Sequence, residues 1–418
     1  MREGSFMIIY KVRSGEDLVD VASKFGTGLK RITADNGMLF TVSPTEGQNL
    51  IITKPISTYT ASGGDTADTI ASVFGIDREK LLQRNPELLR GEPIKNGDEI
   101  VIESGEAELG KIKVMASLKP STDSSAARKI MPYLTYLSIR CCGLRSDGSL
   151  YMQNDRELFA LAGEHRVVPV LEIQKIDPHS ESWWEVIGSV EGICRCAQNI
   201  KQAALSNGYG GINFNLGEIP LEAFDSYVEL VSTVKAMVSP WDMPVISTVP
   251  ETAVISSDVE LLGDSVDEIA LFPKSPGRDI IDVLEIEDLA RLLIEVSGPD
   301  KISLCVPMSA TDVALDRNGK SVREEKFSTA QATRLAMERR AAITYDETRC
   351  LSEYEYLDME FGSLVTHKVE FQDLEGLHEI LCMAKELGID SLNVFNADKY
   401  YAPFWTMLAS LYDIEKIY

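Results

Sequence analysis

The segment Gly208-Tyr209-Gly210-Gly211-Ile212-Asn213-Phe214-Asn215-Leu216-Gly217-Glu218 indicates the architecture of this chain. It follows a helical pattern that closes at Asn207-Gly208, and it reads as a short buried strand that ends in a row of polar residues. In a barrel of parallel strands, functional side chains gather at the carboxyl ends of the strands. The polar residues that end this strand are therefore the first candidates for a functional site.

Apolar segments alternate with amphipathic helical patterns over residues 111–418, which predicts an α/β fold. The strand candidates are residues 113–116, 136–139, 167–173, 211–216, 244–249, 268–272, 302–306 and 391–395. Eight such strands suit a (β/α)8 TIM barrel. An open doubly wound sheet is the alternative, although the segment has no phosphate-binding Gly-rich turn. The alternation breaks over residues 328–374, which predicts a small α+β insertion before the last strand.

The N-terminal part of the chain contains an internal repeat with an offset of 49 residues, because residues 10–26 match residues 59–75. Each unit has a strand, a turn with Gly and an acidic residue, two helices and a closing strand. The acidic residue can cap the first helix. The repeat predicts two βααβ units, over residues 8–54 and 57–103.

These two units resemble the lysin motif (LysM), a family that binds glycans containing N-acetylglucosamine, such as peptidoglycan and chitin. In that family the sugar groove lies between the turn after the first strand and the loop after the second helix. In the first unit the resemblance implies a site at Ser14, Gly15, Glu16, Asp17, Asn36, Gly37 and Met38. In the second it implies Gly64, Asp65, Thr66, Asn85, Pro86, Glu87 and Leu88. The alternative is that these residues serve only as turns and caps.

Residues 210–217 resemble the catalytic strand of family 18 glycoside hydrolases, whose pattern is roughly Asp-Gly-x-Asp-x-Asp-x-Glu. With the two preceding units, the chain resembles spore cortex-lytic N-acetylglucosaminidases over nearly its whole length. In that family the glutamate protonates the glycosidic oxygen, an aspartate orients the substrate's acetamido group, and a tyrosine after the sixth strand binds its carbonyl. This chain has Gly217, Asn215 and Lys274 at those positions, and Asn213 at the earlier aspartate. The resemblance thus implies a barrel that lacks its catalytic acid.

Other side chains near the expected barrel mouth offer alternatives to the missing acid. Glu218 is the fallback acid, but strand alternation turns it away from the face that residues 213, 215 and 217 share, unless a bulge at Gly217 reverses it. Glu172 interrupts an apolar strand, and we expect it to form a structural ion pair, for example with Lys274. Asp346 is another mouth candidate. Phe395 is the preferred candidate for stacking on a sugar ring.

The composition of the chain restricts its partners. Acidic residues outnumber basic ones 65 to 41, which gives a formal net charge of −24. We therefore expect neither nucleic acid nor an anionic membrane as a partner. The N-terminus lacks the features of a signal peptide. The four histidines and seven cysteines show no ligand-like spacing, so we expect no metal and no other cofactor.

The sequence favours a peptidoglycan-binding protein of the spore cortex or coat, with a barrel that is inactive as a chitinase. We expect synthesis in the mother-cell cytoplasm and deposition on the spore, with spore coat proteins as further partners. The alternative is an active N-acetylglucosaminidase that uses Glu218 as a displaced acid. A third possibility is a barrel that binds a protein partner and has lost its affinity for sugar.

Overall fold

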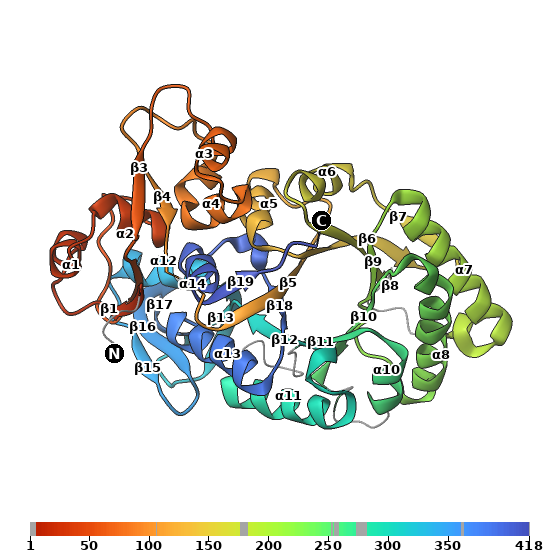
Figure 1. The fold of residues 1–418 in the computed structure, drawn as a ribbon. Helices are drawn as coiled ribbons and strands as arrows, with labels where there is room; N and C mark the ends of the chain where they lie inside the picture. The colour runs from red at the N-terminus through yellow and green to blue at the C-terminus, as the bar shows by residue number, and fades with distance from the viewer. Residues whose placement is uncertain are drawn as a thin grey trace.

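The computed structural model describes residues 6–417 except 106, 176–182, 252–253, 255–258, 273–281 and 361–362. Its centre is a closed barrel of eight parallel strands, in which β18 pairs with β5 and β5 pairs with β6 (Figure 1). The strands are β5 (Gly110–Leu118), β6 (Tyr136–Leu144), β8 (Val168–Lys175), β9 (Gly211–Phe214), β10 (Val245–Pro250), β11 (Glu268–Phe272), β12 (Ile302–Pro307) and β18 (Ser391–Phe395). The predicted TIM barrel is confirmed, and closure excludes the open doubly wound sheet.

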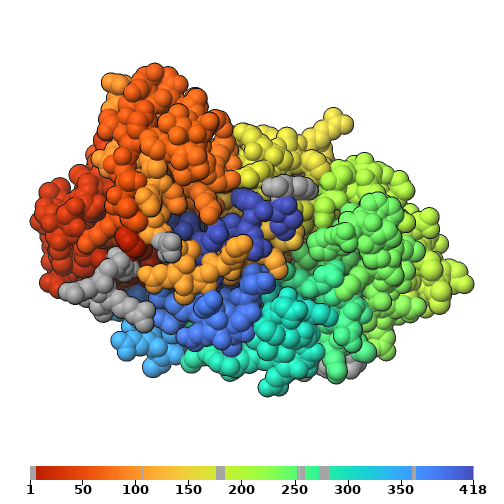
Figure 2. Space-filling model, viewed as in Figure 1, coloured from red at the N-terminus to blue at the C-terminus, as the bar shows by residue number. Residues whose placement is uncertain are grey.

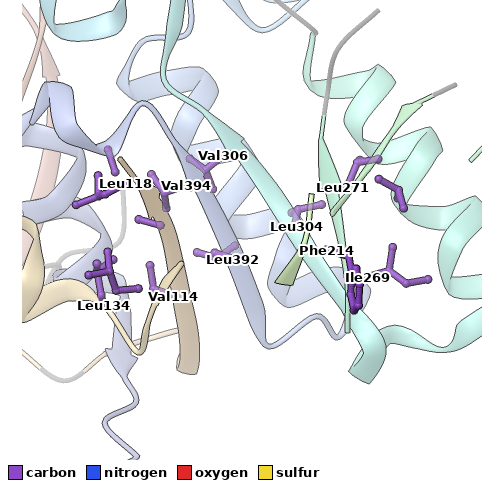
Figure 3. Close-up of a cluster of buried hydrophobic side chains, with 14 of the residues drawn as sticks. Val114, Leu118, Leu134, Phe214, Ile269, Leu271, Leu304, Val306, Leu392 and Val394 are labelled. Atoms are coloured by element: carbon purple, nitrogen blue, oxygen red, sulfur yellow. The ribbon is translucent and has the colours of Figure 1, made fainter. Parts of the chain in front are cut away.

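Helices surround the barrel, and the main core lies between them and the outer faces of the strands. The helices are α5 (Ser124–Ile130), α6 (Arg156–Glu164), α7 (Val190–Asn207), α8 (Leu221–Val238), α10 (Val259–Ser265), α11 (Val283–Ser297), α13 (Leu374–Leu387) and α14 (Ala402–Leu411). Figure 3 shows strand residues of this core, among them Val114, Phe214 and Leu304, all buried. Since successive strand side chains alternate, the neighbouring polar residues point into the barrel. None of the described helices is long and apolar enough to cross a membrane.

Helix α7 illustrates why these segments are helical. Ser189 caps its first turn by accepting a hydrogen bond from the backbone of Gly192, and Gly208 ends it in the left-handed conformation. Its buried residues recur at helical spacing, from Ile193 to Ala204. The cap glycine leads the chain directly into strand β9.

Two short strands extend the barrel sheet. Strand β7 (Leu150–Met152) forms an antiparallel pair with β6, and β19 (Tyr412–Ile414) runs parallel to β5.

The insertion is larger than the predicted residues 328–374. It is a five-stranded antiparallel sheet of β13 (Ser309–Leu315), β14 (Ser321–Ser328), β15 (Thr344–Asp346), β16 (Leu351–Glu360) and β17 (Ser363–Phe371), with helix α12 (Thr329–Arg339). The expected start was wrong because β13 follows the barrel strand β12 at once and joins this sheet through β17. Its buried polar residue Asp312 bonds His367 at 2.9 Å, so part of the sheet's interior is polar.

The two N-terminal units have the same construction. The first has β1 (Met7–Lys11), α1 (Leu18–Phe25), α2 (Leu29–Asp35) and β2 (Asn49–Thr53); the second has β3 (Ser57–Thr60), α3 (Ala67–Phe74), α4 (Arg78–Arg84) and β4 (Glu99–Glu103). In each unit the two strands pair antiparallel. Asp17 and Thr66 begin the first helices with capping boxes, and Gly26 and Gly75 end them in the left-handed conformation.

Both units pack against the rest of the chain, as Figures 1 and 2 show. From the first unit, Thr45 donates a hydrogen bond to the carbonyl of Ala341 at 2.9 Å, and Asn49 donates to Asp373 at 2.6 Å. From the second, Glu79 lies 2.9 Å from His165 at the end of α6, and both side chains are buried. Polar groups buried on both sides of an interface fix its geometry, so the units are held in place on the barrel and its insertion.

We predict that Gly47→Ala weakens this docking. Gly47 has φ +78°, and an added Cβ would lie 1.9 Å from the carbonyl oxygen of Ile343 in the insertion. Gly26→Ala is the matched control, because Gly26 has φ +64° and nothing within 4 Å of an added Cβ. The control should lose about 1–2 kcal/mol of unfolding free energy from its left-handed backbone. Gly47→Ala should lose roughly 3 kcal/mol or more in chemical denaturation; equal losses would contradict the docking contact.

Candidate functional site

The interior of the barrel is polar on the side formed by strands β5 to β10. Glu172 on β8 is in register with Asn213 on β9, and both point inward because Ile173 and Phe214 belong to the outer core. Ser117 of β5 and Ser138 of β6 are paired in the same way. The candidate site therefore lies inside the barrel, from the level of Glu172 and Asn213 to the carboxyl ends of the strands.

Glu172 is the central charged group of this cluster. Its side chain is fully buried, at 0% exposure. One carboxylate oxygen accepts hydrogen bonds from Ser138 at 2.8 Å and from Ser117, and the other accepts from Asn215 at 2.9 Å and Gln174 at 2.8 Å. The two carboxylate oxygens offer about four acceptor positions, and these four donors fill them.

Arg140 supplies the opposite charge. Its Nε lies 3.7 Å from a carboxylate oxygen of Glu172, and it donates a hydrogen bond to Ser117 at 2.8 Å. The expectation of an ion pair for Glu172 is thus met by Arg140 of β6. Lys274, the partner that we suggested for Glu172, lies outside the described residues.

The two asparagines at the aspartate positions are tied into the same network. The Asn213 amide donates to Ser138 at 3.1 Å, and its oxygen accepts from Thr248 at 2.9 Å. Asn215 donates an amide N–H to Glu172. Asparagine here keeps the hydrogen bonding of aspartate but brings no negative charge to the barrel mouth.

At Gly217 the backbone itself departs from a strand. Gly217 has φ +71°, a conformation that L-residues with side chains rarely adopt. An added Cβ would meet only Lys175, at 3.9 Å, so space is available but the backbone geometry is unfavourable. Strand β9 already ends at Phe214, so strict alternation does not extend to this position.

Glu218 is exposed on the loop that follows. It does not cap helix α8, whose first turn has no side-chain cap. The fallback acid therefore lies on an exposed loop and not among the inward-facing side chains of the barrel.

At the barrel mouth, Phe395 and Phe272 pack edge to face with ring centroids 4.7 Å apart. They line a groove between the carboxyl ends of the strands and the insertion, which contributes Phe327. Phe395 is half-buried in this groove, and its stacking on a sugar ring stays a prediction. Asp346 does not line this groove. It lies on β15 at the edge of the inserted sheet, where its carboxylate accepts hydrogen bonds from the turn at Thr348.

Two further buried groups in the barrel, Glu268 and Cys305, are not candidates for the catalytic acid. Glu268 begins strand β11, at the opposite end of the barrel, where burial raises its pKa and Ser391 donates to it at 3.0 Å. Burial also raises the pKa of the Cys305 thiol well above its usual value, which disfavours a nucleophilic thiolate. Among the described residues, no group of three or more His, Cys, Asp and Glu side chains is placed to hold a metal ion.

In the two N-terminal units, several predicted glycan-binding residues have structural partners. Asn36 bonds the backbone of Ile51 through both its amide and its oxygen, at 2.7 and 2.8 Å. Asn85 repeats this with Val101, at 2.9 and 2.8 Å. Each asparagine fastens the second helix of its unit to the closing strand, and both are buried.

The first turns are partly engaged in the same way. Glu16 accepts hydrogen bonds from the Tyr10 hydroxyl and the Arg13 backbone, and Asp65 accepts from Tyr59 and Ser62. Asp17 and Thr66 are the helix caps described above. The exposed members of these turns are Ser14, Gly15, Asp17, Gly64 and Thr66.

The second loops of the two units face other parts of the molecule. Gly37 approaches helix α14, because an added Cβ would lie 2.9 Å from Ala402, and Met38 and Pro86 are buried. Met38, Glu87 and Leu88 line a groove between the two units. Sequence analysis missed Leu39 and Phe40 on this groove, which are 62% and 60% exposed.

We predict that Glu172→Gln destabilises the protein by about 2–3 kcal/mol. The substitution leaves Arg140 without its counter-charge and sets a new amide against groups that already donate. Glu218→Gln is the matched control, since an exposed site should change stability by less than about 0.5 kcal/mol. Urea denaturation of both variants measures the difference. If Glu172→Gln is as stable as the control, the carboxylate is not the centre of this network.

This chain is similar to known proteins in sequence. The LysM domain family matches residues 10–53. Over its whole length, the chain is 24% identical to the cortical fragment-lytic enzyme of Bacillus anthracis, covering 98% of this chain and 99% of the relative. The corresponding enzyme of Bacillus cereus is 23% identical, with the same coverage.

Solved structures show the same fold. The Bacillus cereus spore cortex-lytic enzyme SleL superposes with a TM-score of 0.78 at 22% identity, covering 98% of this chain and 99% of that structure. A chitinase from Chromobacterium violaceum covers 72% of this chain and 99% of its own, with a TM-score of 0.63 at 12% identity. Residues 10–53 are thus a LysM domain, and the chain as a whole resembles spore cortex-lytic enzymes in sequence and fold.

Proposed function

We propose that this protein binds peptidoglycan, or a related N-acetylglucosamine glycan, without hydrolysing it. The observation that carries the proposal is the state of the carboxylates around the barrel mouth. Position 217 is a glycine with a left-handed backbone, and Glu172 is fully buried with four hydrogen-bond donors. Neither position presents an accessible carboxyl group to a glycosidic oxygen.

The chemistry of glycoside cleavage makes this loss decisive. A sugar leaving group departs as an alkoxide unless an acid protonates it, and a positioned general acid contributes roughly 10²–10⁴-fold in rate. In the substrate-assisted mechanism, a negative charge beside the acetamido group also stabilises the cyclic intermediate. Asn215 supplies no such charge, and its amide already donates to Glu172. This barrel therefore lacks both the family's proton donor at position 217 and the negative charge at position 215.

The binding part of the proposal rests on the N-terminal units. The LysM domain at residues 10–53 belongs to a family of glycan-binding modules, and the second unit repeats its architecture. The aromatic groove at Phe395 offers a second surface of suitable chemistry, since apolar sugar faces pack on aromatic rings. The names of the relatives favour spore cortex as the glycan. We propose deposition from the mother cell onto the cortex or coat, with coat proteins as further partners.

A hydrolase remains the second candidate, because the relatives that align with the whole chain are named cortical fragment-lytic enzymes. In that case Glu218 is the acid, since it directly follows the position of the missing glutamate. Its exposure on the loop gives it access to substrate.

We predict that the purified chain sediments with insoluble peptidoglycan and releases no reducing ends from cortex fragments. Gly217→Glu alone should not create activity, because the left-handed backbone at this position disfavours the new side chain and Asn215 stays uncharged. Reducing-end assays on both proteins, beside an active chitinase, measure this. Hydrolysis that Glu218→Gln abolishes would establish the enzyme instead, and failure to sediment would contradict the binding role.

A further inference from the structure

The two N-terminal units are in direct contact, and a groove runs between them. One wall comes from helix α2 and the loop after it, which carries Leu39 and Phe40; the other comes from the segment between α4 and β4, which carries Leu88 and Ile94. Figure 1 shows the units side by side on one flank of the barrel. Arg31 of the first unit and Glu87 of the second form an ion pair at 3.5 Å, which joins the two walls.

The groove exposes apolar groups that nothing in the described chain covers fully. Leu39 and Phe40 are 62% and 60% exposed, which is high for large apolar side chains that lie next to each other. Contiguous exposed apolar groups with a polar rim mark binding sites. The ring of Phe40 offers a flat surface for the apolar face of a sugar.

The charges of the groove specify what kind of molecule fits. Four basic and four acidic side chains line it: Lys30, Arg31, Arg90, Lys95, Glu87, Glu92, Asp98 and Glu99. Some are paired within the groove, as Lys95 is with Glu92 at 3.6 Å. This balance differs from the chain as a whole, with its net charge of −24. A balanced, partly apolar groove favours a neutral, amphipathic ligand over a polyanion or a basic peptide.

An acceptor without a hydrogen bond lies at the same place. The Oε2 atom of Glu87 is buried and accepts no hydrogen bond from any described residue, although it lies 3.5 Å from Arg31. Burial raises the pKa of this carboxyl group. Buried polar atoms are usually satisfied, so this oxygen is an unused acceptor at the wall of the groove, and a ligand group that reaches it must donate. The N–H of an acetamido group, or a sugar hydroxyl, is such a donor.

We infer that one neutral N-acetylglucosamine oligomer binds in this shared groove, in contact with both units at once. This inference rests on the proposed glycan-binding function and specifies its site. It explains why Met38, Glu87 and Leu88 border one groove although they come from different units. It also agrees with the structural use of Asn36 and Asn85, which are not free to bind a sugar in two separate grooves.

Calorimetric titration of the full chain with a soluble β-1,4-linked N-acetylglucosamine oligomer tests the inference. We expect one oligomer per chain, and roughly tenfold weaker binding for Phe40→Ala on one wall and for Leu88→Ala on the other. Phe40→Trp and Leu88→Met should retain affinity, because they keep the aromatic surface and the apolar volume. Val73→Ala is the control, since Val73 is 78% exposed on α3 and does not line the groove.

The outcomes separate this inference from the proposed function. Thermal melting of each variant shows whether a loss of affinity reflects unfolding, with Phe40→Ala the least at risk because its ring is largely exposed. Two oligomers per chain, or unchanged affinity in folded Phe40→Ala and Leu88→Ala, would overturn the shared groove and leave glycan binding intact. Absence of any binding by the unaltered chain would overturn both.

Discussion

The carboxylate of Glu172 is the group around which the interior of the barrel is organised. A charge buried at 0% exposure is tolerated only when its lone pairs are filled and an opposite charge lies near. Here two hydroxyls, two amides and the guanidinium of Arg140 meet those requirements, and they come from β5, β6, β8 and the residue that follows β9. The side chains that would otherwise face a substrate are directed inward to this charge.

This arrangement connects the altered sequence motif with the proposed loss of catalysis. Asn215 lies where an aspartate would place a second negative charge beside Glu172, and such a pair would repel. As an asparagine it donates to Glu172 instead, at 2.9 Å. The network thus favours the substitution at 215, and position 217, where the family has its acid, is a glycine with a left-handed backbone. What remains is a stable barrel whose mouth carries aromatic rings, with the N-terminal units as the main candidates for glycan contact.

Much of the fold was predictable from local patterns, because apolar strands, helix caps and the 49-residue repeat are all visible in the sequence. The start of the insertion was not, since β13 carries polar residues such as Asp312 whose burial depends on His367, far along the chain. In the site, the sequence predicted an ion pair for Glu172, but it did not predict Arg140 as the partner. Arg140 lies on β6, and only the register of the barrel brings it to Glu172. The contact of Arg31 with Glu87 depends likewise on how the two units pack, which no local pattern encodes.

Among the residues that the structure describes, neither Gly217 nor the buried Glu172 can reach a glycosidic oxygen to protonate it, so we propose that the barrel does not cleave glycans. The most direct measurement is mass spectrometry of an N-acetylglucosamine oligomer incubated with an equimolar amount of the full chain, where even one slow turnover is visible. We expect the oligomer to be recovered at its original length after it has bound. Shortened oligomers in the unaltered protein, absent when the protein is omitted, would contradict it.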